Sequence, residues 1–219
     1  MRSLYGDRHN GKQEIERAIK RLNEVGLLSH LTEGEVVERC QTIQEENLSV
    51  DRLVYQLPQL TYWFDTEYLW DPTVSASYEA LVSDLANISR GMFAPQQVVV
   101  TPEADEGLEY DGELLLTFKL FDHTYQQPLK FLGDWVDLRF IGCINRALAA
   151  TGVDGRYYWI DTNDQCVVLI FLTPPQLVVA KELIGEPLKP WAAASMGRLE
   201  VWSLKVALTL GKILHRIKS

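Results

Sequence analysis

The sequence lacks the features that mark secreted, redox-active and membrane-spanning proteins. It has three cysteines, Cys40, Cys143 and Cys166, and their odd number and wide spacing indicate neither a disulfide framework nor a Cys-x-x-Cys motif. No stretch reaches the run of about 18 apolar residues that predicts a membrane-spanning helix. Residues 1–20 contain no apolar segment of the signal-peptide kind. We therefore expect a cytoplasmic protein with reduced thiols.

Glycine and proline are also sparse, at 14 and 9 of 219 residues, and no internal repeat or low-complexity tract occurs. Disordered chains are poor in apolar residues, whereas 47% of this chain is hydrophobic. A chain of this length buries most of the surface of its unfolded form and needs no cross-links. The composition therefore predicts a globular fold.

Positive charge is scarce over most of the chain. The formal net charge is −9, and residues 1–188 carry 15 Lys and Arg against 29 Asp and Glu. This balance disfavours nucleic-acid binding through phosphate contacts and suits a basic protein partner. Solubility alone is the other explanation of the charge. Residues 189–219 differ, because they hold six basic residues and Glu200 as their one acid.

The motifs of common enzymes are absent. The sequence contains no Gly-x-Ser-x-Gly elbow, no P-loop and no Gly-x-Gly-x-x-Gly fingerprint. The segment 161–164 lacks the later glycine and glutamate of a calcium loop, so it predicts a hairpin turn. Metal-ligand spacing is missing among the four histidines, His9, His30, His123 and His215. We expect no catalytic residue, no metal and no cofactor.

Apolar periodicity predicts helices in the N-terminal half. Residues 12–26 carry one apolar stripe that ends at a glycine. Thr32 and Glu35 have the spacing of a capping box, which predicts a second helix to about residue 47. The next predicted elements are a short helix through Gln56 that stops before Pro58, a strand or extended connector over 60–64, and a helix over 75–89.

The period changes to that of strands in the second half. Residues 97–101 and 114–121 are rich in β-branched and apolar side chains. Asp122 and His123 are expected to form the tight turn of a hairpin whose second strand is 125–131. The other predicted elements are a helix over 135–150, a hairpin of strands 157–161 and 165–172, a helix over 174–184 and an amphipathic helix over 198–218.

These elements predict an α+β fold, in which a largely antiparallel sheet of hairpins has helices packed on it. We expect an N-terminal helical portion over 1–57, packed at one end of the sheet or over its second face, in one compact domain with an α+β core over 58–188. Residues 189–219 form a separate basic segment. This segment is either a helix docked on the core or a helix that binds a partner. A helix on a membrane surface is a third alternative, although we expect no membrane partner for the rest of the chain. A non-native tail is the fourth.

Acidic and aromatic side chains gather in two places. One is the end of the aromatic run 61–64, and the other is the turn-rich segment 102–113. Aromatic anchors ringed by charge are typical of interfaces, although a core role for the aromatic residues (Tyr62, Trp63, Tyr68, Trp70) and a solvated role for the acids stay open. The candidate partner-binding residues are Asp65, Glu67, Trp70, Glu103, Asp105, Glu106, Glu109 and Asp111.

Several stretches carry a resemblance to a known group: YWFD (62–65), YEALVSDLANISRG (78–91), LLLTFKLFDHTYQQPLKF (114–131), WVDLRFIGCINRALAATG (135–152), RYYWIDTNDQCVVLIFLTPPQ (156–176) and LIGEPL (183–188). Together they resemble, over about residues 55–188, the immunity proteins encoded beside bacterial polymorphic and contact-dependent toxins. The resemblance implies a cytosolic, non-enzymatic protein that binds a cognate toxin domain and blocks its activity in interbacterial competition. This group has no active-site motif, so no residue role is carried over.

Two other functions stay open from the sequence. A hydrolase with an unrecognised site would use Cys166 or a pair of carboxylates. A chaperone or adaptor for a secreted effector would bind its partner without neutralising it.

Overall fold

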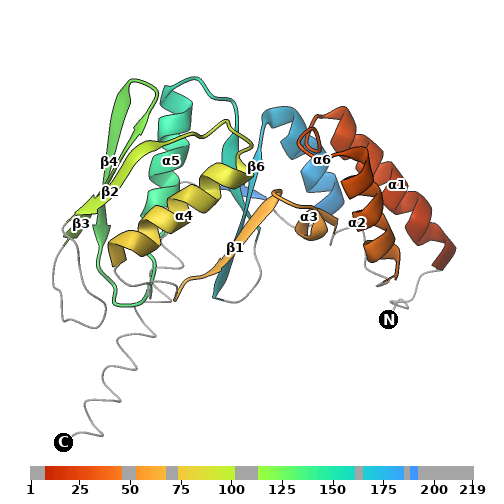
Figure 1. Ribbon diagram of the computed structural model, residues 1–219, viewed down its shortest axis with the longest axis horizontal. Coiled ribbons are helices and arrows are strands. Elements are labelled where there is room, and N and C mark those ends of the chain that lie inside the picture. Colours follow the sequence, from red (N-terminus) through yellow and green to blue (C-terminus); the bar gives the residue numbers. More distant parts are fainter. Residues whose placement is uncertain are drawn as a thin grey trace, which may run out of the picture.

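The computed structural model describes residues 8–45, 53–67, 74–101, 113–160, 165–184 and 188–191 (Figure 1). None of the helices within these residues has the length and apolar character needed to cross a membrane. The helix expected over 198–218 lies outside them. The described elements are α1 (Arg8–Glu24), α2 (Glu33–Glu45), α3 (Leu53–Gln56), β1 (Thr61–Asp65), α4 (Val74–Ile88), β2 (Gln96–Thr101), β3 (Glu113–Leu120), β4 (His123–Lys130), α5 (Arg139–Ala150), β5 (Arg156–Ile160), β6 (Cys166–Leu172), α6 (Pro174–Ile184) and β7 (Lys189–Pro190).

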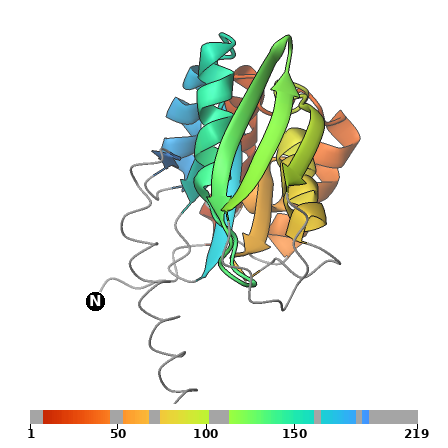
Figure 2. The ribbon, with the colours of Figure 1, turned by 90° about the vertical axis from the view of Figure 1, so that its left-hand side faces the viewer.

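The predicted α+β class is confirmed. The described strands form two sheets, with strand orders β1-β6-β5-β7 and β2-β3-β4, and every pairing between them is antiparallel. Figure 1 shows α4 and α5 between the two sheets, with the N-terminal helices and α6 at the opposite end of the molecule. The turned view in Figure 2 brings the β3–β4 hairpin to the front, with α5 and α4 on either side of it.

The strand β6 is the centre of the larger sheet and is buried on both faces. Its sequence CVVLIFL has no polar alternation, which is the pattern of a strand covered from two sides. Val167, Leu169 and Phe171 join the core cluster formed with α4, α5 and the second sheet. Val168, Ile170 and Leu172 join the cluster formed with the N-terminal helices and α6. The N-terminal helices therefore cover the second face of the sheet, which was one of the two expected positions.

The start of α2 follows the predicted capping box. The Glu35 carboxylate accepts hydrogen bonds from the backbone N–H and the hydroxyl of Thr32, each at 2.8 Å. The Thr32 hydroxyl accepts the Glu35 N–H in return, at 3.3 Å. These bonds lower the pKa of Glu35, because they stabilise its ionised form. At the preceding helix end, Gly26 takes the left-handed φ of 68° that ends α1.

Two predicted boundaries were wrong. The helix expected from Trp135 begins at Arg139, because residues 132–135 form a turn closed by a bridge between Leu132 and Trp135. The β3–β4 turn consists of Phe121 and Asp122, since Leu120 already pairs with His123 across the hairpin. Phe121 takes a positive φ of 53°. Turn positions with positive φ favour glycine, asparagine and aspartate, so the sequence did not indicate phenylalanine there.

A buried asparagine joins α5 to the larger sheet. The Asn145 amide accepts the Tyr157 N–H at 2.8 Å and donates to the carbonyl oxygens of Tyr157 at 3.0 Å and Trp191 at 3.1 Å. The Trp191 N–H also donates to Tyr157, at 3.3 Å. This amide therefore satisfies three buried backbone groups and holds residue 191 beside β5, where its indole packs on Trp159.

We predict that Asn145→Ala lowers the free energy of unfolding by about 2–4 kcal/mol, because several buried backbone groups lose their only described side-chain partner. Denaturant unfolding followed by circular dichroism measures the change. Asn23→Ala, at an exposed position of α1, is the control and should stay within about 0.5 kcal/mol of the wild type. Equal stability of the two variants would contradict this role of Asn145.

Candidate functional site

Of the predicted partner-binding residues, Asp65 and Glu67 fall within the described part of the chain. They lie at the end of β1 and just after it. The other predicted residues, Trp70, Glu103, Asp105, Glu106, Glu109 and Asp111, lie outside the described residues. The candidate site is therefore built around the end of β1.

Thr66, between the two acids, anchors this end of β1. Its hydroxyl donates to the Gln165 carbonyl at 2.8 Å, and its N–H donates to the same oxygen at 3.2 Å. Its own carbonyl accepts the Val136 N–H at 2.7 Å. Three chain segments, after β1, before β6 and before α5, are thus held together at one buried threonine.

The acids on either side of Thr66 have defined positions. The Asp65 carboxylate accepts the Glu67 N–H at 2.9 Å, which closes a local turn. It also accepts the Gln165 side-chain amide, at 3.2 and 3.0 Å from its two oxygens. None of the described ion pairs involves this carboxylate.

A third acid, Asp134, belongs to the same surface. It lies in the turn from Leu132 to Trp135, next to Gly133, whose φ of 71° makes the turn possible. The hydrogen bond from Val136 to Thr66 brings this turn to the end of β1. We call Asp65, Glu67 and Asp134 the acidic corner. Sequence reasoning missed Asp134, because it was placed at the edge of a predicted helix; the Gly133-Asp134 pair was the available turn signal.

The charges of the acidic corner interact with one another. Partial desolvation on folding raises the pKa of Glu67, and the charges of Asp134 and Asp65 raise it further. The carboxylates repel one another in the free protein. A cation placed among them is attracted by each carboxylate, and this attraction offsets their repulsion. The arrangement is therefore suited to receive a lysine or arginine side chain.

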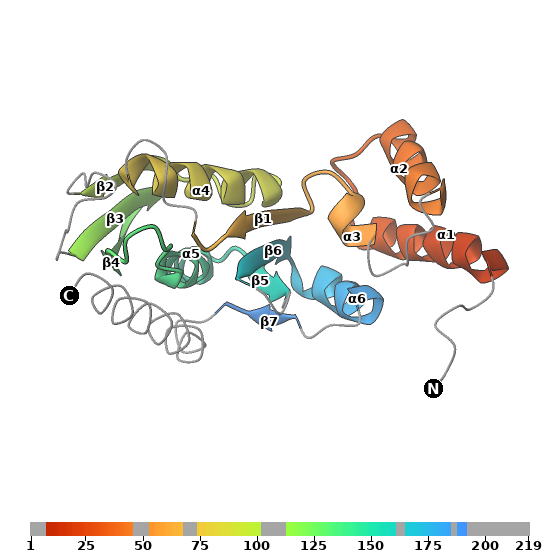
Figure 3. The same cartoon turned by 90° about the horizontal axis from the view of Figure 1, so that it is seen from below.

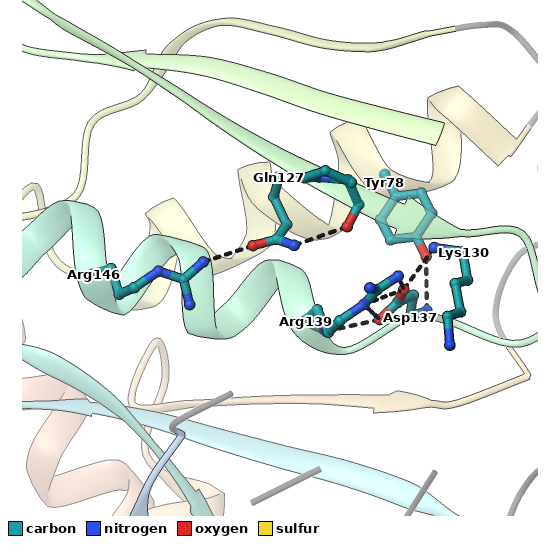
Figure 4. A network of polar contacts seen from close by, with 7 residues as sticks. Tyr78, Gln127, Lys130, Asp137, Arg139 and Arg146 are labelled. Carbon is teal, nitrogen blue, oxygen red and sulfur yellow. Dashed lines mark hydrogen bonds and ion pairs between the residues drawn. The ribbon is translucent and has the colours of Figure 1, made fainter. Parts of the chain in front are cut away.

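A buried carboxylate, Asp137, positions the loop that carries Asp134 (Figure 4). Asp137 accepts the N–H of Lys130 at 2.7 Å and that of Arg139 at 3.0 Å, and it forms an ion pair with the Arg139 guanidinium. Its own N–H donates to the Tyr78 hydroxyl at 2.7 Å. Burial raises the pKa of Tyr78, so this hydroxyl stays neutral. The network joins α4, β4 and α5 around one residue, Asp137.

An exposed tryptophan lies on β1 beside the corner. Trp63 is 60% exposed, whereas Phe64 is buried and Tyr62 stacks on it at a ring distance of 5.6 Å. Both roles left open for the aromatic run, core and surface, therefore occur on β1. Tyr62 and Phe64 face the core, and Trp63 faces the other side of the strand. Tyr68, named with them, lies outside the described residues.

The described histidines lie apart from the cysteine and carboxylates named for hydrolytic chemistry. Cys166 lies opposite Asp65 in the β1–β6 ladder. Of the histidines with described side chains, His30 bonds the Pro58 carbonyl at 2.9 Å and His123 begins β4 in the other sheet. Across the described ranges, no group of three or more His, Cys, Asp or Glu residues could hold a metal ion. The exposed acids and Trp63 therefore form the candidate site among the described residues.

The fold and this corner define an α+β protein with an acidic, aromatic surface at a sheet edge. Comparison with protein-family models found no matching family, and comparisons with curated proteins and with solved structures found no match. The function is therefore argued from the residues of the site.

We predict that Asp137→Asn lowers the free energy of unfolding by about 3 kcal/mol, because it leaves the Arg139 guanidinium without its buried counter-charge. Denaturant unfolding at pH 7 measures this. Asp154→Asn, at an exposed position with the same change of charge, should have almost no effect. A loss no larger than that of the control would show that the network does not hold the loop.

Glu67→Gln is expected to stabilise the protein slightly at neutral pH, by no more than about 0.5 kcal/mol, because Glu67 is exposed. The raised pKa of Glu67 means that its ionised form disfavours folding. The gain from Gln should therefore develop as the pH rises from about 4.3 through the raised pKa, and vanish at lower pH. Melting temperatures across this range test it, with Glu14→Gln, at an exposed position of α1, as the control with the same change of charge.

Proposed function

We propose that this protein is a cytoplasmic immunity protein that binds a cognate bacterial toxin domain and blocks its activity. The observation that carries the proposal is the juxtaposition of the acidic corner with exposed Trp63 on one strand end. Tryptophan is among the residues that dominate binding energy when an interface covers it, and the surrounding charge selects the partner. The net charge of −9 extends the same preference to long range.

The acidic corner favours a basic partner surface. Oppositely charged surfaces associate faster, and the gain falls as salt screens the attraction. A toxin domain that acts on nucleic acid carries such a surface, because it must neutralise phosphates. An acidic inhibitor would compete for that surface and so block access to the substrate.

Rigid support of the corner also favours binding. The Thr66 bonds and the Asp137 network hold the acids in place before a partner arrives. A preorganised surface loses little conformational freedom on binding, and this raises affinity without further contacts.

The experiment is co-expression with the toxin encoded at the protein's own genetic locus, in a bacterial host. We expect the wild-type chain to restore growth and to form a complex with the purified toxin domain. Host cells that die equally fast with and without the chain would refute the proposal. A stable complex that leaves the toxin active would also refute it and indicate a chaperone or adaptor instead.

The residues of the corner are tested by charge reversal. Glu67→Lys combined with Asp134→Lys should raise the dissociation constant at low salt at least about tenfold and slow association, because both changes oppose a basic partner. Glu14→Lys combined with Glu24→Lys changes the net charge equally on α1, far from the corner in sequence, and should have a much smaller effect. Equal effects of the two pairs would mean that net charge alone acts and that the corner is not the contact.

A further inference from the structure

We propose that the outer edge of β1 binds its partner by strand addition, with an extended, basic segment of the partner pairing along residues 61–65. This inference rests on the proposed function, because it names how the same surface takes its partner. An exposed sheet edge offers unpaired N–H and C=O groups, and an added strand pairs with them.

The first observation is the position of β1. It is an end strand of the sheet order β1-β6-β5-β7, and it pairs with β6 alone. Figure 1 shows β1 in front of β6, and Figure 3 shows it along one border of the sheet. The other end of this sheet has the two-residue strand β7 beside β5.

The second observation is the direction of the backbone groups of β1. The Thr66 N–H bonds the Gln165 carbonyl, and these two residues continue the register in which Asp65 lies opposite Cys166. Hydrogen-bonded pairs alternate along an antiparallel ladder. Tyr62 and Phe64 therefore bond to β6, and the N–H and C=O groups of the alternate residues Thr61, Trp63 and Asp65 point outward.

The third observation is that the described strand β1 lacks three common edge protections. Many natural edges are protected by lysine, proline or a bulge. The strand TYWFD has no proline or lysine, and its pairing with β6 runs over five residues without a register shift. Within the described residues, no backbone hydrogen bond outside the β1–β6 ladder involves Trp63.

The chemistry of the occupant follows from the acids at one end of the edge. A strand laid beside β1 would place a side chain close to Asp65, whose charge is joined at this end of the strand by those of Glu67 and Asp134. These charges attract a lysine or arginine there and repel an acidic segment. A second copy of this chain is a poorer occupant, because each copy has a net charge of −9. The partner strand also gains the exposed ring of Trp63 as a cross-strand neighbour.

Amide hydrogen exchange of the free protein tests the edge itself. We expect the Phe64 amide to exchange slowly and the Trp63 amide to exchange at least about a hundredfold faster, since only the former is in the ladder. Protection of both amides in the dilute free protein would overturn the proposal. Protection of Trp63 that grows with protein concentration would point to a second copy of the chain and would also overturn it.

The partner test compares two variants at one position against the purified toxin domain from the same locus. Trp63→Ala and Trp63→Pro both remove the indole, but only proline removes the outward N–H and blocks pairing. We expect alanine to weaken binding about tenfold and proline to weaken it at least about tenfold more. In the complex of the wild-type chain, the Trp63 amide should become protected while the Phe64 amide stays as before.

The outcomes separate the two proposals. Equal weakening by alanine and proline, with no new protection of Trp63, overturns strand addition while toxin binding stands. Failure of the wild-type chain to bind or protect overturns both. The circular dichroism spectrum and melting temperature of Trp63→Pro check its fold. Should that variant unfold, protection of the Trp63 amide in the wild-type complex decides the question alone.

Discussion

The burial of β6 on both faces is the constraint on which the rest of the structure depends. A strand with no polar alternation must be covered twice, and the chain meets this requirement with two separate sets of helices. α4 and α5 cover one face and bind the second sheet behind them. The N-terminal helices and α6 cover the other face. Removing either layer would leave a row of large apolar side chains in water, so both halves of the chain fold on the same strand.

The proposed binding surface is a consequence of that arrangement. With β6 in the centre and β5 and β7 on one side of it, β1 is left at the opposite border of the sheet. The loops at the end of β1 meet those before β6 and α5, and Thr66 and Asp137 hold them there through buried hydrogen bonds. The same bonds bring three carboxylates together, and these carboxylates repel one another in the free protein. This repulsion and the exposed tryptophan beside it support the proposed contact with a partner.

The surroundings of the cysteines and of the corner acids also bear on the proposed binding role. Hydrolysis by a cysteine requires a base within hydrogen-bond reach. Cys166 lies in the ladder opposite Asp65, and burial raises the pKa of Cys143, which lowers the share of its reactive thiolate form. The carboxylates of the corner lie on an exposed strand end rather than in an enclosed cleft. Exposed carboxylates of this kind support the proposed contact with a partner, where shape and charge matter more than a reactive group.

Local elements were determined by the sequence itself. The helix over 174–184 and the Thr32–Glu35 capping box were predicted as they occur, because their signals lie within a few residues of one another. Asp65 and Glu67 were also named from a local pattern, and their role in partner binding stays a prediction. Tertiary structure alone decided that the strands form two sheets, that β1 lies at an edge and that Asp134 joins the corner. These features depend on contacts between distant residues, such as Thr66 with Gln165, and no periodicity along the chain encodes which strand pairs with which.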